Sequence, residues 1–125
     1  MPKFTVTPYE VKGAVDYDRL LAEFGVEPLS EAQTKRLENL AGQSHHFLRR
    51  RIFFAQRDLD FALREQEKGN LFLYTGCGPS GPIHMGHAVV WLFTKWLQDA
   101  LGAQLWFQFT DDEKFLYKDQ TLEQI

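Results

Sequence analysis

Cysteine and long apolar runs are both scarce in this sequence. Cys77 is the only cysteine among 125 residues, so no disulfide bond can form within the chain. The apolar run from Ala88 to Phe93 is soon followed by Lys95 and is too short to cross a bilayer. The sequence shows no signal peptide, so we expect a cytoplasmic location and no membrane partner.

An excess of positive charge is also missing. The chain has 14 basic and 17 acidic side chains, a net charge of −3 with neutral histidines. No overall basic field therefore indicates a nucleic-acid partner, and any contact with RNA must depend on local patches. The run Arg49-Arg50-Arg51 is one such patch. It can contact phosphates or form the solvated face of a helix, and spacing alone leaves both interpretations open.

The first part of the chain is predicted to be mainly helical. Residues 4–7 alternate in polarity before a proline, which predicts a short edge strand. Apolar side chains at i, i+3, i+4 and i+7 predict a helix over residues 17–24. A capping box of Ser30 and Gln33 starts a second helix, and we expect both helices to cover one side of a sheet. Asp58 is expected to cap a third helix.

The later part of the chain follows a strand, helix, strand pattern. Apolar segments at 71–74 and 105–109 flank a long apolar helix that ends at Gly102. This order predicts a right-handed parallel βαβ unit and an α/β fold. The first strand shows no polar alternation, so we expect both of its faces to be covered. Residues 119–125 resemble a helix start without a second turn, so we expect a fragment of a larger protein.

A loop of glycines and prolines, residues 75–83, joins the first of these strands to the helix. Gly76, Gly78 and Gly81 tolerate positive φ and allow a ligand to approach the backbone closely. The spacing matches neither G-x-G-x-x-G nor a Walker loop, so the glycines alone are weak support for a function. Backbone N–H groups at the start of the following helix favour anions.

Two histidines make the prediction more specific. His84 and His87 share one face of the first helical turn, and Gly86 leaves that face bare for a flat ring. Their imidazoles can donate hydrogen bonds to phosphate oxygens in a transition state. Two other interpretations stay open: a zinc pair that needs further ligands, or two histidines satisfied at a helix start. The nearby candidates for further zinc ligands are Cys77, Asp111, Asp112 and Glu113.

The segment Pro79-Ser80-Gly81-Pro82-Ile83-His84-Met85-Gly86-His87 resembles the His-x-Gly-His signature of class I aminoacyl-tRNA synthetases. Further segments resemble the tryptophanyl-tRNA synthetases of the archaeal and eukaryotic cytosolic type, and together they cover nearly the whole chain: residues 45–50, 52–54, 57–58, 74–76, 93–99 and 110–114. The resemblance implies a truncated, partial Rossmann-like parallel sheet of the class I catalytic half in residues 70–125. A short edge strand and a helical segment would precede it in residues 1–69.

The same resemblance implies an activity and a set of partners. The activity is that of a tryptophan–tRNA ligase, which activates tryptophan with ATP, accompanied by Mg²⁺, and transfers it to the tRNA for tryptophan. The full-length protein is expected to be a homodimer. The tyrosyl-tRNA synthetases are an alternative within the class, but their pattern after the second strand differs from residues 110–114.

Roles for single residues follow from matching positions. For ATP, the resemblance implies that Gly86 lies under the adenine, with His84 and His87 near the reacting phosphates. Lys114 would approach the phosphates, and the loop residues that complete the ATP site would be Gly76, Cys77 and Gly78. For tryptophan, Tyr74 and Gln108 would reach the indole nitrogen, and Glu113 would pair with the ammonium group.

Two departures from the family pattern qualify these expectations. Cys77 occupies a position where the family usually has arginine, which removes a phosphate contact. No Lys-Met-Ser-Lys-Ser-like loop, second nucleotide half or anticodon-binding domain occurs within these residues. We therefore expect the chain alone not to form tryptophanyl-adenylate at an enzyme's rate. The rival functions are another His-x-Gly-His nucleotidyltransferase, or a truncated paralogue that binds tryptophan or a protein without catalysis.

Overall fold

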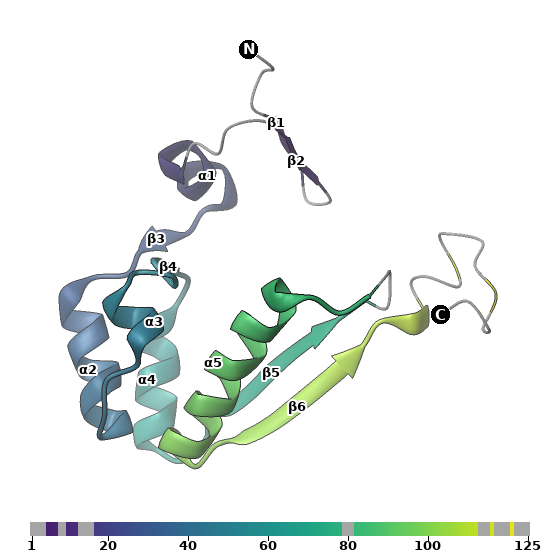
Figure 1. Cartoon of the computed structure of the whole chain (residues 1–125). Helices are drawn as coiled ribbons and strands as arrows, with labels where there is room; N and C mark the ends of the chain where they lie inside the picture. The colour runs from purple at the N-terminus through teal and green to yellow at the C-terminus, as the bar shows by residue number, and fades with distance from the viewer. Residues whose placement is uncertain are drawn as a thin grey trace.

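A two-stranded parallel sheet, with helices stacked on one side, forms the centre of the chain in the computed structural model (Figure 1). The structure describes residues 5–7, 10–12, 17–78, 82–112, 116 and 121. Its elements are β1 (Thr5–Thr7), β2 (Glu10–Lys12), α1 (Tyr17–Phe24), β3 (Glu27–Pro28), α2 (Glu31–Ala41), α3 (His46–Arg49), β4 (Ala55–Gln56), α4 (Leu59–Glu67), β5 (Phe72–Cys77), α5 (Met85–Leu101) and β6 (Gln104–Phe109). This mixture confirms the predicted α/β class. None of the described helices is long and apolar enough to span a membrane.

The helix ends show which capping predictions are correct. At the start of α2, Ser30 Oγ accepts from the Gln33 amide, and the Gln33 side chain accepts from the Ser30 amide, both at 3.1 Å. This confirms the predicted capping box. The prediction for α4 is wrong, because Asp58 has a φ of 56° and its side chain makes no cap hydrogen bond. Side-chain capping needs an extended N-cap backbone. Gln56 Oε1 accepts from the Leu59 amide instead, at 2.9 Å.

The predicted short edge strand is confirmed as β1, which belongs to a sheet separate from the parallel one. β1 pairs antiparallel with β2 in a separate two-stranded sheet, with Val6 opposite Val11. Only two residues, Pro8 and Tyr9, separate the two strands in the sequence. So short a connection favours pairing with the next segment over pairing with a distant sheet.

The core lies between the helices, and α5 joins it to the sheet. Leu37 of α2, Leu48 of α3 and Leu63 of α4 are its most buried members, with 5%, 5% and 2% exposure. The surrounding side chains from α5 are Phe93, Trp96, Leu97 and Leu101. Packing against this core is how an amphipathic helix gains most of its stability. The core includes residues from both sides of the predicted boundary at residue 69, and that division stays a prediction.

The helices form two layers on one side of the sheet, which differs from the prediction that the first two helices cover it. α5 contacts both β5 and β6, and the Trp91 ring meets the Phe107 ring edge-on at 5.3 Å between centroids. α2 packs chiefly against α4 and α5, and α1 packs against β3. The crossover helix α5 covers the sheet because it follows β5 in the chain and connects it to β6.

β5 and β6 are parallel neighbours, as predicted, with Tyr74 opposite Trp106 and Gly76 opposite Gln108. The prediction that both faces of β5 are covered is wrong. Phe72, Tyr74 and Trp106 are each 62% exposed on the face away from α5. A single crossover helix covers one face only, and no described element packs on the other (Figure 1).

His45 holds α3 against α5. Its Nδ1 accepts from the Phe47 amide at 3.2 Å, and its ring lies 4.9 Å from that of Trp96, between centroids. Burial lowers the pKa of His45, and the nearby charges of His46 and Arg49 lower it further. The neutral imidazole is therefore the form that the fold stabilises.

We expect acidification to destabilise the chain through His45. A lowered folded pKa means that the unfolded chain binds the proton more readily, so stability is lost as the pH falls below about 6.5, the ordinary imidazole value. His45→Asn keeps a capping oxygen without this titration. Urea unfolding at about pH 7.5 and pH 5 should show a larger loss of stability in the parent chain than in this variant. Equal losses would contradict the assignment.

Candidate functional site

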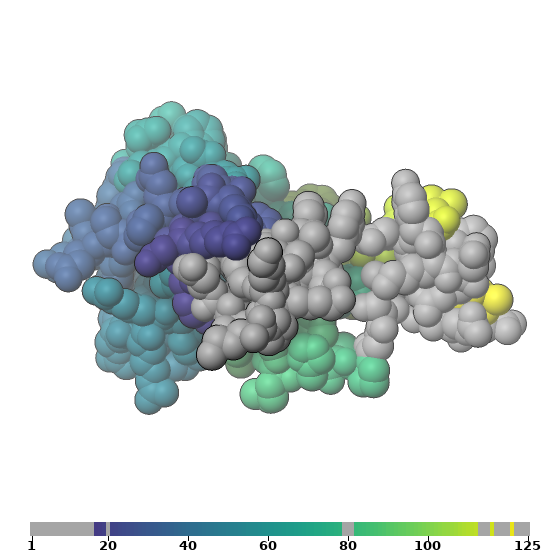
Figure 2. Space-filling view, turned by 90° about the horizontal axis from the view of Figure 1, so that it is seen from above, coloured from purple at the N-terminus to yellow at the C-terminus, as the bar shows by residue number. Residues whose placement is uncertain are grey.

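The candidate site lies at the carboxyl ends of β5 and β6, where α5 begins. Cys77 and Phe109 end the paired strands opposite each other, and the Thr110 amide donates to the Cys77 carbonyl at 3.2 Å. Atoms coloured for the first part of α5 lie at one margin of the molecule, shown in green in Figure 2. Ligands of open parallel sheets bind at this edge, because loops and helix starts converge there.

His84 and His87 lie together at the start of α5. His84 is the N-cap residue and His87 is the third residue of the helix, and their ring centroids are 4.2 Å apart. The predicted shared face is confirmed, although His84 stands just before the helical turn. His84 is exposed and His87 is half-buried. The pair therefore presents one cluster of imidazole atoms to solvent.

The helix cap fixes how each of these imidazoles can act. His84 Nδ1 accepts from the Gly86 amide at 3.1 Å, and His87 Nδ1 accepts from the His84 amide at 3.3 Å. A ring nitrogen that accepts a hydrogen bond carries no proton, so in the neutral imidazole the proton is on Nε2. Each histidine thus keeps an Nε2–H donor beyond the cap. Two oriented N–H donors at a helix start can bind an anionic group.

Two glycines allow close approach at this site, each in a different way. Gly76 is the last but one residue of β5 and does not lie in the predicted loop, because the strand continues to Cys77. A Cβ atom at Gly76 would lie 2.2 Å from the Gln108 carbonyl oxygen. A Cβ atom at Gly86 would lie 2.9 Å from Cε1 of His84. Gly76 thus permits the strand contact, and Gly86 permits the present position of the His84 ring.

Tyr74 and Gln108 share the exposed face of the sheet. Tyr74 pairs with Trp106, and Gln108 is two residues farther along β6, opposite Gly76. Side chains alternate along a strand, so these positions lie on the same face and are diagonal neighbours. Because Gly76 has no side chain, nothing from β5 stands directly opposite Gln108 on that face. The prediction that these two residues are neighbours is confirmed, and their role stays a prediction.

Sequence reasoning missed two aromatic residues on this face. Phe72 and Trp106 line an open hollow together with Tyr74 and Gln104. Both are large and mostly exposed, which is unusual enough to mark a binding surface. In the sequence these positions are spaced two apart, residues 72 and 74 on one strand and residues 104, 106 and 108 on the other, as expected for side chains on one face of a sheet. It becomes readable only once the register of the two strands is known.

Two of the predicted site residues, Glu113 and Lys114, lie outside the described residues. Cys77 is a free, half-buried thiol at the end of β5, and Gly78 follows it. Within the described part of the chain, no group of three or more His, Cys, Asp and Glu side chains gathers as a metal site. The described geometry therefore supplies no ligand set for the zinc interpretation.

Comparison with known proteins gives a consistent family. No protein-family model matches the chain. Its sequence is 49% identical over 124 residues to the tryptophan–tRNA ligase of Saccharolobus solfataricus, over 98% of this chain and 33% of that protein. It is 49% identical over 122 residues to the tryptophan–tRNA ligase of Thermococcus sibiricus, over 96% of this chain and 32% of that protein.

Solved structures agree with the sequence matches. The tryptophanyl-tRNA synthetase of Encephalitozoon cuniculi bound to tryptophan aligns with a TM-score of 0.78 and 46% identity, over 86% of this chain and 33% of that chain. The enzyme of Plasmodium falciparum aligns with a TM-score of 0.80 and 42% identity, over 88% and 32%. The chain thus spans about a third of the length of these relatives. Over that span the chain is similar, in sequence and in fold, to tryptophanyl-tRNA synthetases.

Proposed function

We propose that this chain supplies one half of the active site of a tryptophan–tRNA ligase, which activates tryptophan with ATP and transfers it to tRNA. The observation that carries the proposal is the pair of fixed imidazole donors, His84 and His87, at the start of the helix that follows the strand carrying Tyr74. The resemblance further implies Mg²⁺ bound with ATP, a homodimeric full-length enzyme and a cytoplasmic location.

The residues at the start of α5 fit a nucleotide. His84 and His87 each have an Nε2–H donor free to meet a phosphate oxygen, because Nδ1 is already used in the cap. Gly86 adds no side chain to the surface between them. ATP would supply the activated α-phosphate that the tryptophan carboxylate attacks. The histidines would orient that phosphate and stabilise the charge that develops on its oxygens.

The exposed sheet face fits an indole. Phe72, Tyr74 and Trp106 offer aromatic surface, and the Tyr74 hydroxyl and the Gln108 amide are polar groups able to meet the indole N–H. A site that pairs a substrate N–H with buried polar groups rejects analogues without that N–H, since those groups are then left unpaired. In this proposal Glu113 pairs with the ammonium group and Lys114 approaches the phosphates.

A chimaera tests the proposed function. Residues 1–125 would replace the matching third of the Saccharolobus solfataricus ligase, and tryptophan-dependent ATP–pyrophosphate exchange would be measured. We expect exchange that requires tryptophan and is not supported by tyrosine. A folded chimaera that binds tryptophan without exchange would favour the non-catalytic paralogue. Exchange without amino-acid dependence would favour another nucleotidyltransferase.

We predict that Tyr74 and Gln108 recognise the indole nitrogen. Tyr74→Phe and Gln108→Ala in the chimaera should each weaken kcat/KM for tryptophan by about five- to thirtyfold, the effect of one buried hydrogen bond of 1–2 kcal/mol. Gln43→Ala is the control, because Gln43 is an exposed glutamine after the end of α2 and does not line the hollow on the sheet. Parent-like kinetics in both test variants would disprove the assignment.

We predict that Cys77 lies beside the bound phosphates. The thiol is free and stands at the end of β5, next to the loop that leads to His84. Alkylation of Cys77 in the chimaera should slow several-fold when ATP is saturating, and tryptophan alone should change the rate little. Cys77→Arg should leave ATP binding intact or improve it, because arginine adds a phosphate contact. Equal labelling rates with and without ATP would count against this position.

A further inference from the structure

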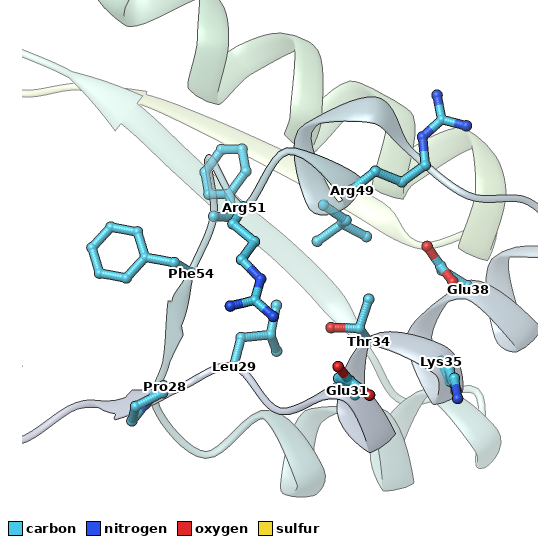
Figure 3. Close-up of a pocket in the computed structure, with 11 residues that line it drawn as sticks. Pro28, Leu29, Glu31, Thr34, Lys35, Glu38, Arg49, Arg51 and Phe54 are labelled. Atoms are coloured by element: carbon cyan, nitrogen blue, oxygen red, sulfur yellow. The ribbon is translucent and has the colours of Figure 1, made fainter.

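A second hollow lies away from the sheet, between α2 and the segment that follows α3 (Figure 3). Three basic side chains line it, Lys35, Arg49 and Arg51, together with two carboxylates, Glu31 and Glu38. Leucine and phenylalanine side chains form its apolar floor. Two of the three arginines that the sequence singled out therefore line one concave surface. Arg49 is the last residue of α3 and Arg51 lies beyond its C-cap, so the arginine run does not form one continuous helix face.

Arg51 occupies a backbone position that normally suits glycine. Its φ is 53°, its amide donates to the Leu48 carbonyl, and the Ile52 amide donates to the Phe47 carbonyl, both at 2.9 Å. These two hydrogen bonds form a Schellman motif, in which the left-handed residue after the C-cap is usually glycine. An arginine here costs backbone stability that glycine would not. With this backbone conformation, the Arg51 side chain extends across the hollow toward Thr34 of α2 (Figure 3).

The basic groups of the hollow are left without partners. Among the described residues, neither Arg49 nor Arg51 makes a side-chain hydrogen bond or ion pair, and the same holds for Lys35. Arg36, one residue farther along α2, contrasts with them, because it pairs with Glu67 at 2.8 Å and with Asp60 at 3.5 Å. The two carboxylates of the hollow therefore stand near the cations without neutralising them directly.

We infer that this hollow contacts successive phosphates of an RNA backbone, and, resting on the proposed function, that the RNA is the tRNA substrate. Figure 3 shows Arg49 and Arg51 extending in different directions, so a single small anion cannot engage both. Successive phosphates of one RNA strand can contact both side chains. Guanidinium groups suit phosphate oxygens, and such contacts position a nucleic acid without reading its bases.

Arg51→Gly gives a test in which binding and stability move in opposite directions. Labelled tRNA would be titrated with the 125-residue chain, by fluorescence anisotropy, between about 50 and 200 mM salt. Each phosphate contact accounts for about a threefold loss of affinity over this range. Arg51→Gly should therefore bind more weakly than the parent chain at low salt and reduce the salt slope by about one, so that its affinity falls about threefold less between the two salt concentrations, while its resistance to urea increases. Arg49→Ala should show the same loss in binding.

Arg50→Ala is the matched control, because Arg50 carries the same charge in the same segment but does not line the hollow. It should change affinity by less than twofold. Equal weakening by Arg50→Ala and Arg51→Gly would show a general charge effect and overturn the inference, as would absence of tRNA binding by the parent chain. Tryptophan-dependent ATP–pyrophosphate exchange by the chimaera is measured separately. If the chimaera catalyses exchange but Arg51→Gly binds tRNA as the parent chain does, this inference alone is wrong. If Arg51→Gly weakens tRNA binding but the chimaera shows no exchange, the proposed function alone is wrong.

Discussion

Replacing His84 or His87 with alanine in the chimaeric enzyme should lower tryptophan-dependent ATP–pyrophosphate exchange by about 10²–10³-fold each. This is the usual effect of removing one donor that stabilises developing charge. The structure gives the reason to expect that both donors are oriented before the substrate binds. Each Nδ1 is held in the cap of α5, so each Nε2–H is already oriented and pays little reorganisation cost when the phosphate binds.

The double variant separates a joint role from two independent ones. The rings lie 4.2 Å apart, so we expect them to act on the same phosphate oxygens. Groups that act as a unit show strongly non-additive effects, and the double variant should therefore lose much less than the product of the single losses. The loss should fall on kcat more than on KM, since the donors act mainly on charge that appears in the transition state.

A capping variant is the necessary control. His84→Asn keeps an N-cap oxygen for the Gly86 amide but has no donor at the position of Nε2. It should preserve the stability of α5 and still lose activity as His84→Ala does. If His84→Asn instead restored exchange to the parent rate, His84 would be a structural cap only, and the proposed role in phosphate binding would be wrong.

The arrangement of this pair was predictable from sequence because it is local. His84 and His87 are three positions apart at a helix start, and the capping box that fixes them lies within four residues. The same holds for Ser30 and Gln33 at the start of α2. Local spacing determines such contacts directly, so they can be predicted from the sequence.

Features that depend on distant partners were predicted less well. The composition of β5 suggested burial on both faces, but coverage of a strand is decided by the elements that pack on it, and α5 covers one face only. The glycines and prolines of residues 75–83 predict a loop that includes Gly76. Its place inside β5 depends on how closely β6 approaches, which the sequence of β5 cannot show.

That close approach leads to a large expected effect on stability. Gly76→Ala should destabilise the chain by about 3 kcal/mol, the upper part of the range for overpacking a filled site. The added Cβ would lie 2.2 Å from the Gln108 carbonyl oxygen and 3.1 Å from its carbon. Both are backbone atoms, so no rotamer change can relieve the contact. β5 and β6 must separate at the end of the sheet where the ligand site lies.

Gly86→Ala is the matched comparison, since its Cβ would meet only the ring of His84, a side chain that can rotate away. Alanine is also the better helix former at that position, so we expect little loss of unfolding free energy from Gly86→Ala. Urea unfolding measures both variants, and hydrogen exchange of the β6 amides should locate the damage near Gln108 in Gly76→Ala alone. A Gly76→Ala chain as stable as the parent, with protected β6 amides, would show that the two strands can accept a side chain between them and that glycine is not required there.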